Sequence, residues 1–256
     1  MMDNRHNNIV AIIQARMGST RLPGKVLMEI DGVPLLELMM SRVAKSELLD
    51  KVVIATSTLP KDDRIEKFCQ KGNYECFRGS ENDVLSRYYE CAKIFNADVI
   101  VRMTADCPLI DPEIVDEVIS DYFNKKVDYA ANTVPPKTST FPDGSDVEVF
   151  SFEALERGFI KAKKDSEREH VTHYFWRSNN GFKTGQLRQK NNWSNYRFTV
   201  DYPEDFEVIK FILKELKRRK SFGSLSEIIE IIEANPEIKE KNSKYYFGIG
   251  VLAKKE

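Results

Sequence analysis

The sequence predicts an α/β domain with a mostly parallel sheet and helices on both of its faces. Three short apolar runs, at 9–13, 52–55 and 99–103, have the length and composition of buried strands. Amphipathic stretches of helical period separate them, and such alternation is typical of a parallel sheet. Each run ends in an unusual polar loop. Because ligands bind beyond the carboxyl ends of parallel strands, we expect these loops to converge at one site.

The other elements of the first half are expected in order along the chain. Pro34 is placed to begin a helix, since proline is well tolerated at the first helical position. Asp111 is placed to cap the helix that follows the third apolar run. The expected elements here are helices at 34–45, 64–71 and 112–123, a strand at 74–77, and a helix that opens at Glu81 or Asn82.

The second half begins with a stretch of different composition. Residues 134–151 are rich in Pro, Ser, Thr and Gly and end in an alternating pattern that predicts a strand at 146–150. Ser166 and Glu169 have the spacing of a capping box and predict a helix at 166–176. The remaining expected elements are helices at 152–163, 203–218 and 225–232, a strand at 197–200, and an edge strand or irregular tail at 245–249.

The length and composition fit one large domain. A hydrophobic content of 41% over 256 residues suffices for a substantial core. We expect a single domain over 1–240, in which about 133–195 is an inserted segment, followed by a tail over 241–256. An insertion of this kind commonly covers an active site or contacts a partner.

Several classes of protein are excluded by the composition. A net charge of −1 provides no basic footprint, so nucleic acid is not expected as a partner. No apolar run of about 18 residues predicts a membrane span, and the polar start of the chain lacks an apolar signal region. The four cysteines include no C-x-x-C pair, which is typical of reduced thiols rather than a zinc ribbon. We therefore expect a cytoplasmic protein that binds no membrane.

The loop after the first apolar run combines three cations with glycines. Arg16, Arg21 and Lys25 supply positive charge, and Gly18 and Gly24 let backbone N–H groups approach an anion. This combination suits a polyphosphate, although a solvated basic turn is the simpler alternative. The loop is not a Walker A motif, because five residues separate the glycines and a valine follows the lysine.

The run QARMGSTRLPGKVL at 14–27 resembles the signature loop of the cytidylyltransferases that activate acidic sugars, the 3-deoxy-octulosonate and acylneuraminate group. The similarity covers about 9–216 and is greatest to the spore coat polysaccharide biosynthesis protein F branch. The resemblance implies a Rossmann-like nucleotidyltransferase sheet, with the inserted segment serving as a lid over the sugar and as a dimerisation surface. It also implies CTP and a small acidic sugar as substrates, Mg²⁺ as cofactor, and a homodimer.

The resemblance assigns the loop residues to the nucleotide. Lys25 and Arg21 would hold the β- and γ-phosphates, and Arg16 the α- or β-phosphate. The nucleotide-binding positions implied in the same loop are Ala15, Gly18 and Ser19. The acceptor oxygen would then attack the α-phosphorus and pyrophosphate would leave, so that positioning and charge carry the reaction. The sequence offers no obvious general base.

Two aspartates are the expected metal ligands. Asp106 follows the third apolar run, and Asp201 follows the strand expected at 197–200. Mg²⁺ typically takes one or two protein carboxylates together with water and substrate phosphate. Both residues resemble the metal-binding positions of the family. Each could instead cap a turn or a helix, since both lie in D-x-P patterns.

Residues near the base are less specific. Thr56 and Thr104 end strands beside the expected phosphate site and could contact a pyrimidine edge, or could simply cap turns. Arg87 lies in FRGSENDVLSRY, which loosely matches the family segment beside the base. Cytosine specificity therefore rests on the resemblance.

Two stretches are the expected acceptor-binding region. PDGSDVEVFS and EREHVTHYF resemble segments of the spore-coat branch, and an arginine there would suit a sugar carboxylate. His173 stands where that branch is expected to have proline. His170 and His173 could ligate a metal, but no third ligand is evident. The acceptor-binding candidates are Asp143, Asp146, Glu148, Arg168 and His170.

Three other functions stay open at this stage. A sugar-1-phosphate nucleotidyltransferase that uses another base would usually carry a longer loop. A nucleotide-sugar glycosyltransferase would show a D-x-D motif after a strand, where this chain has Asp106-Cys-Pro. A scaffold that has lost its activity is the non-enzymatic alternative.

Overall fold

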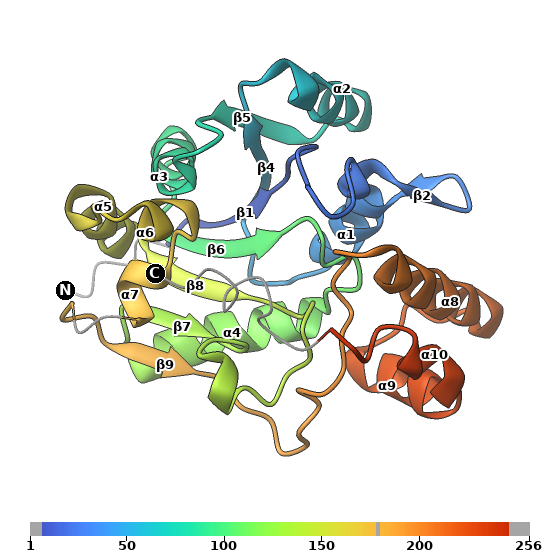
Figure 1. The fold of residues 1–256 in the computed structure, drawn as a ribbon. Helices are drawn as coiled ribbons and strands as arrows, with labels where there is room; N and C mark the ends of the chain where they lie inside the picture. Colours follow the sequence, from blue (N-terminus) through green and yellow to red (C-terminus); the bar gives the residue numbers. More distant parts are fainter. Residues whose placement is uncertain (1–6, 178–179, 246–256) are drawn as a thin grey trace.

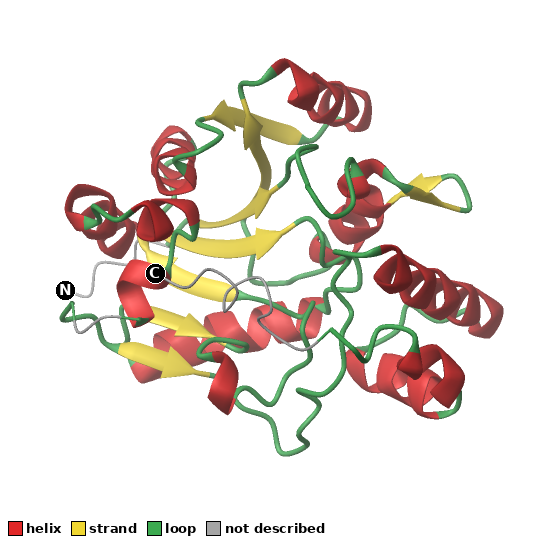
Figure 2. Ribbon diagram, viewed as in Figure 1, coloured by secondary structure: helices red, strands yellow, loops and turns green. Residues whose placement is uncertain are grey.

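A computed structural model of the chain describes residues 7–177 and 180–245 (Figure 1). In this part of the chain, seven strands form one sheet in the order β5–β4–β1–β6–β8–β7–β9 (Figures 1 and 2). Strand β8 pairs antiparallel with both β6 and β7, and all other pairs in the sheet are parallel. The strands are β1 (Ile9–Gln14), β4 (Lys51–Ser57), β5 (Glu75–Gly79), β6 (Val99–Thr104), β7 (Tyr129–Ala131), β8 (Glu148–Ser151) and β9 (Thr184–Gln186). The predicted mostly parallel α/β sheet is confirmed.

The central strand β1 is buried on both faces, which explains why its sequence is a continuous apolar run. Ile9, Ala11 and Ile13 contribute to one core, whereas Val10 and Ile12 contribute to the other. Successive side chains of a strand point to opposite faces, so the two cores lie on the two sides of the sheet.

Helices fill both cores, as predicted (Figure 1). The first core receives apolar side chains from α1 (Leu35–Val43), α2 (Asp63–Gly72), α4 (Pro112–Lys125), α8 (Pro203–Arg219) and α9 (Leu225–Glu233). The second receives them from α3 (Val84–Ile94), α5 (Phe152–Lys161) and α7 (His173–Trp176). The other described elements are α6 (Asp165–Glu169), α10 (Pro236–Glu240), a small hairpin of β2 (Glu29–Ile30) and β3 (Val33–Pro34), and 3₁₀ turns η1 (Lys25–Leu27), η2 (Pro60–Asp62) and η3 (Pro136–Thr138).

Helix caps follow the local sequence closely. Asp111 caps α4 as predicted, because its Oδ1 accepts the backbone N–H of Glu113 at 3.1 Å. The prediction that α3 opens at Glu81 or Asn82 is wrong by one or two residues. Asp83 is its cap and accepts the backbone N–H of Ser86 at 2.9 Å.

The predicted helix at 166–176 is wrong. The chain forms two short helices, α6 and α7, and Val171 between them has φ of 55°. This conformation is unfavourable for a β-branched residue, but the Val171 side chain is fully buried in the second core. Ser166 does not cap the helix. Glu167 instead accepts the backbone N–H groups of Lys163 and Lys164.

The predicted strand at 197–200 is also wrong. This segment is extended, but it pairs with loops rather than with the sheet: the N–H of Phe198 donates to Asp143, and that of Val200 donates to the Asp106 carbonyl at 2.8 Å. The physical reason is that both edges of β6 are already paired, with β1 and β8. The strand expected at 146–150 begins only at Glu148.

Two strands of the seven-stranded sheet were not predicted, nor was the small hairpin of β2 and β3. β7 and β9 have three residues each, which is too short for a periodic pattern. The segment 133–195 supplies β8 and β9, so it is partly built into the main sheet. The strand considered at 245–249 lies outside the described residues, except for Tyr245. Within the described part of the chain, no helix has the length and apolar character needed to cross a membrane.

Candidate active site

A cavity of about 210 Å³ lies at the carboxyl ends of β1 and β6. The strands that follow β1 in the chain lie first on one side of it, as β4 and β5, and then on its other side, as β6. Ligands bind at such a switch point in open α/β sheets. The loops that follow β1 and β6 converge there as expected, whereas the loop that follows β4 contributes no residue to the cavity. The residues that line the cavity are Gln14, Arg16, Ser19, Thr20, Arg21, Lys25, Val26, Thr104, Ala105, Asp106 and Asp201.

The ammonium of Lys25 bridges the two aspartates. Its Nζ lies 2.7 Å from Oδ2 of Asp106 and 2.8 Å from Oδ1 of Asp201. Gly24 allows this placement, because it adopts a left-handed φ of 72° immediately before η1, and its N–H donates to the Met17 carbonyl. Three residues far apart in sequence are thus brought within hydrogen-bond distance.

Burial and charge act against each other in this cluster. Burial lowers the pKa of Lys25, but Asp106 and Asp201 more than offset it, so the pKa is raised and the ammonium stays charged. Burial raises the pKa of Asp106, but Lys25 has the larger opposite effect, and the pKa is lowered to about 2. The pKa of Asp201 is lowered in the same way, against burial, mainly by Lys25. Both carboxylates are therefore ionised at neutral pH.

The other loop cations lie beside this bridge. Arg21 forms an ion pair with Oδ1 of Asp201, and its guanidinium lies 5.1 Å from the ring centroid of Tyr202. Arg16 lines the cavity. Ser19 lines it as well, and its hydroxyl accepts the backbone N–H of Leu22 at 3.3 Å.

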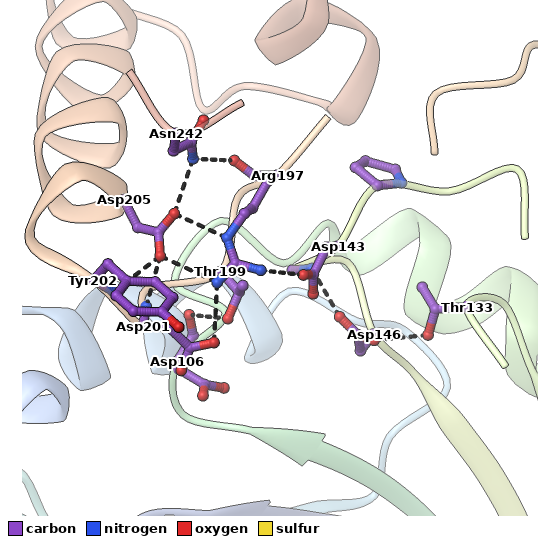
Figure 3. Close-up of polar contacts among 12 residues, drawn as sticks. Asp106, Thr133, Asp143, Asp146, Arg197, Thr199, Asp201, Tyr202, Asp205 and Asn242 are labelled. Carbon is purple, nitrogen blue, oxygen red and sulfur yellow. Dashed lines mark hydrogen bonds and ion pairs between the residues drawn. The ribbon is translucent and has the colours of Figure 1, made fainter. Parts of the chain in front are cut away.

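Several aspartates lie at the cavity or directly behind it. Figure 3 shows five aspartates, at 106, 143, 146, 201 and 205, around Arg197. Lys25 contacts Asp106 and Asp201, and Arg21 contacts Asp201. Burial and the neighbouring Asp146 raise the pKa of Asp143 well above its usual range. Burial raises the pKa of Asp146 as well, although it accepts hydrogen bonds from Thr133 and from the backbone of Gly144. The surroundings therefore suit an added cation.

The other nucleotide-binding candidates differ in whether they line the cavity. Thr104 lines it, whereas Ala15, Gly18, Thr56 and Arg87 do not. Thr56 is fully buried and its hydroxyl has no hydrogen-bond partner. Arg87 is fully buried too: Nη1 donates to the Ser80 carbonyl at 3.0 Å, and Nε and Nη2 are unpartnered.

Two backbone positions shape the loop. The N–H of Ala15 donates to the Ala55 carbonyl at 3.1 Å, which continues the β1–β4 pairing into the loop. A side chain at Gly18 would place its Cβ 2.4 Å from Nζ of Lys61. Glycine at this position therefore allows Lys61, which forms an ion pair with Glu81, to lie against the loop.

None of the five acceptor-binding candidates lines the cavity. Arg168 binds the Asp83 carboxylate, with Nε 3.0 Å from each oxygen, and so joins α6 to the start of α3. Glu148 contacts Arg102 and accepts a hydrogen bond from the hydroxyl of Tyr129 at 2.6 Å. Asp143 binds Arg197.

His170 and His173 lie close together, with ring centroids 4.3 Å apart. Burial, with a smaller effect of His170, lowers the pKa of His173 to about 3, so this side chain is neutral at physiological pH. Among the residues that the structure describes, no group of three or more His, Cys, Asp or Glu side chains is arranged to hold a metal.

The residues at the site that the sequence did not indicate are Gln14, Thr20, Val26 and Ala105, which line the cavity, and Arg197 beside it. Gln14 ends β1 and lines the cavity, and its buried Oε1 has no hydrogen-bond partner. A polar residue at the end of an apolar run was the available signal. Arg197 is buried beside Asp201, and only its tertiary contacts reveal it.

A parallel sheet whose central strand ends in a cationic, glycine-containing loop, opposite two aspartates, defines a nucleotidyltransferase. More specifically, the chain belongs to the cytidylyltransferase family, since the family model described as "Cytidylyltransferase" matches residues 10–245. The family predicted from the loop motif is confirmed.

Known relatives place the chain more closely. It is 36% identical over 238 residues to the spore coat polysaccharide biosynthesis protein SpsF of Bacillus subtilis, which covers 90% of this chain and 96% of the relative. It is 40% identical over 115 residues to the 3-deoxy-manno-octulosonate cytidylyltransferase of Pelobacter propionicus, covering 44% and 43% of the two chains. The solved structure of a cytidylyltransferase from Leptospira borgpetersenii superposes with a TM-score of 0.84 at 34% identity, covering 91% and 97%.

Proposed function

We propose that this protein is a Mg²⁺-dependent enzyme that transfers CMP from CTP to a small acidic sugar and releases pyrophosphate. The observation that carries the proposal is the bridge from Lys25 to Asp106 and Asp201 at the cavity. Membership of the cytidylyltransferase family supports CTP as the donor. The names of the relatives support a sugar acid as acceptor and a role in surface polysaccharide or glycoconjugate biosynthesis.

The loop cations would bind the triphosphate. An ammonium has three donors, and two of those on Lys25 are taken by the aspartates, so the third is available to a phosphate oxygen. Arg21 uses one side of its guanidinium for Asp201 and keeps further N–H donors for the β- and γ-phosphates. Arg16, on the same cavity wall, would neutralise the α- or β-phosphate.

The residues present fit a divalent cation held partly by substrate. Asp106 and Asp201 direct one oxygen each at the same point, which Lys25 occupies, so a cation bound by both carboxylates would displace the ammonium toward the phosphates. Mg²⁺ needs only one or two protein carboxylates when water and phosphate complete its shell. When bound there, the ion would neutralise charge on the phosphates and orient the acceptor.

The reaction forms a bond from the acceptor oxygen to the α-phosphorus and breaks the bond from that phosphorus to the bridging oxygen of pyrophosphate. Asp106 is a poor proton acceptor, since its pKa is about 2, so its contribution is charge and position. The cations of the loop would stabilise the negative charge that develops on the leaving pyrophosphate.

The segment 133–195 and the oligomeric state belong to the same proposal. We expect this segment to cover the acceptor, with Asp143, Asp146, Glu148, Arg168 and His170 as candidates for contacts to it. We also expect the enzyme to act as a homodimer in the cytoplasm.

A nucleotide panel tests the proposal. The protein is mixed with Mg²⁺, a panel of sugar acids and sugar 1-phosphates, and CTP, UTP, ATP or GTP in turn, and pyrophosphate and nucleotide sugars are measured by mass spectrometry. We expect pyrophosphate and a CMP-sugar with CTP and a sugar acid. Activity only with a sugar 1-phosphate and another nucleotide would support the alternative nucleotidyltransferase. Absence of pyrophosphate across the whole panel would contradict the proposal.

A further inference from the structure

Arg197 is buried next to the cavity without lining it. Only 5% of its side chain is exposed, and it lies in the extended segment that leads to Asp201. An arginine cannot lose its charge in a protein interior, so its burial requires compensating carboxylates. The structure provides three of them.

Each guanidinium nitrogen of Arg197 faces a carboxylate (Figure 3). Nη1 donates to Asp143. Nη2 donates to Oδ2 of Asp201 at 3.0 Å and to Oδ2 of Asp205 at 3.1 Å, and Nε donates to Oδ1 of Asp205 at 2.9 Å. One planar group therefore joins the loop at Asp143 to the aspartate at the cavity.

Asp205 makes this arrangement rigid. It is fully buried in the first turn of α8, and its Oδ2 also accepts the backbone N–H groups of Asp201 and Tyr202, each at 3.0 Å. The same carboxylate thus fixes both the backbone of Asp201 and the guanidinium that binds its side chain. Asn242, near the end of the described chain, donates to Oδ1 of Asp205 at 3.0 Å and to the Arg197 carbonyl at 3.1 Å.

The two oxygens of Asp201 consequently have different partners. Oδ2 is held by Arg197, whereas Oδ1 faces Lys25 at 2.8 Å and Arg21. A carboxylate held in this way presents one oxygen to the cavity and cannot turn to present both. We infer that Arg197 is a positioning residue that fixes Asp201 as a one-oxygen ligand for the cation bound with the nucleotide. This inference rests on the proposed function.

The planar set of N–H donors on the guanidinium, rather than its charge alone, allows Arg197 to bind three carboxylates at once. Lysine would keep the positive charge but could not bind Asp143, Asp201 and Asp205 in one plane. Arg197→Lys therefore separates the two contributions. Arg42→Lys is the matched control, because Arg42 is also buried but donates to the carbonyls of Ile110, Phe222 and Gly223, away from the cavity.

The experiment measures Mn²⁺ binding directly. Mn²⁺ held on each variant is measured by equilibrium dialysis with saturating CTP and no acceptor, so that Mn²⁺ chelated by free CTP is equal on both sides of the membrane and no turnover is needed. We expect roughly tenfold weaker Mn²⁺ binding by Arg197→Lys, because partners that orient a metal ligand typically contribute a factor of this size. Arg42→Lys should lower the thermal midpoint and leave Mn²⁺ binding unchanged.

The outcomes separate the two proposals. If the wild-type protein binds no Mn²⁺ with CTP, the proposed function fails. If the wild type binds it and Arg197→Lys binds it equally well, or Arg42→Lys weakens it as much, the positioning role is overturned and the proposed function stands. Should Arg197→Lys not fold, Asn242→Ala decides. It loosens Asp205 without removing a charge and should weaken Mn²⁺ binding several-fold, and unchanged binding would overturn the inference.

Discussion

Replacing Lys25 by methionine tests the central charge arrangement of the site. The variant keeps the length of the side chain and removes the ammonium that bridges Asp106 and Asp201. The pKa of Asp106 falls from 3.8 to about 2 in the folded protein, and Lys25 is the main cause that lowers it against burial. One pKa unit is worth ~1.4 kcal/mol, so the ionised form of Asp106 is stabilised by about 2 kcal/mol. We expect Lys25→Met to lower the free energy of unfolding at pH 7 by at least that amount.

The pH dependence gives a second check on the same variant. Because the pKa of Asp106 is lower in the folded state than in the unfolded state, its stabilisation is present above about pH 4 and is lost as the pH falls toward 2. In Lys25→Met the two carboxylates lose their cation and protonate at a higher pH. The difference in stability between wild type and variant should therefore narrow as the pH falls from about 5 to about 3.

Urea unfolding followed by the fluorescence of Trp176 and Trp193 measures this difference. Lys217→Met is the control, since Lys217 forms a surface ion pair with Asp31 in which both side chains are well exposed. Exposed pairs contribute little, so its unfolding midpoint should stay at the wild-type value. A Lys25→Met protein within about 0.5 kcal/mol of wild type at pH 7, or a difference that does not change with pH, would refute the reasoning.

Three further variants test other parts of the site. Asp106→Asn keeps the shape of the side chain and removes its charge, so pyrophosphate release should fall about 100-fold or more, and wild-type turnover would exclude a catalytic role for Asp106. Gln14→Leu removes an unpartnered polar group from the cavity and should lower kcat/KM by roughly 5- to 10-fold, whereas a change below about twofold would mean that Gln14 does not contact substrate. For His173, the pKa is lowered from 6.5 to about 3, so below pH 6.5 the unfolded chain takes up a proton that the folded protein does not. Between pH 6.5 and 5, the free energy of unfolding of the wild type should fall by about 2 kcal/mol more than that of His173→Leu. Urea unfolding that shows the same pH dependence for both proteins would contradict this.

Local patterns predicted the elements that depend on local physics. The runs that became β1 and β6 could be identified because burial on both faces of a strand demands a continuous apolar sequence. The cap of α4 at Asp111 depends on residues two positions apart and was also predictable. The same holds for the cationic loop, whose residues lie within one short stretch.

Predictions failed where distant parts of the chain compete. The segment 197–200 has the composition of a strand, but β1 and β8 already occupy the edges of β6. The pattern at 166–176 is helical, but the helix is interrupted at Val171, which has a positive φ and a side chain buried in the second core. No local signal reports either fact, because each depends on which other segments pack nearby.

The sequence by itself determined the fold class, the family, and the residue types that meet at the cavity, since apolar period and a contiguous motif are local properties. The tertiary structure decided how those residues are held. Lys25 bridges Asp106 and Asp201, and Arg197 donates hydrogen bonds to Asp143, Asp201 and Asp205. These contacts join positions up to 176 residues apart. Charges interact through space and not along the chain, so these contacts exist only once the sheet and its two cores have formed.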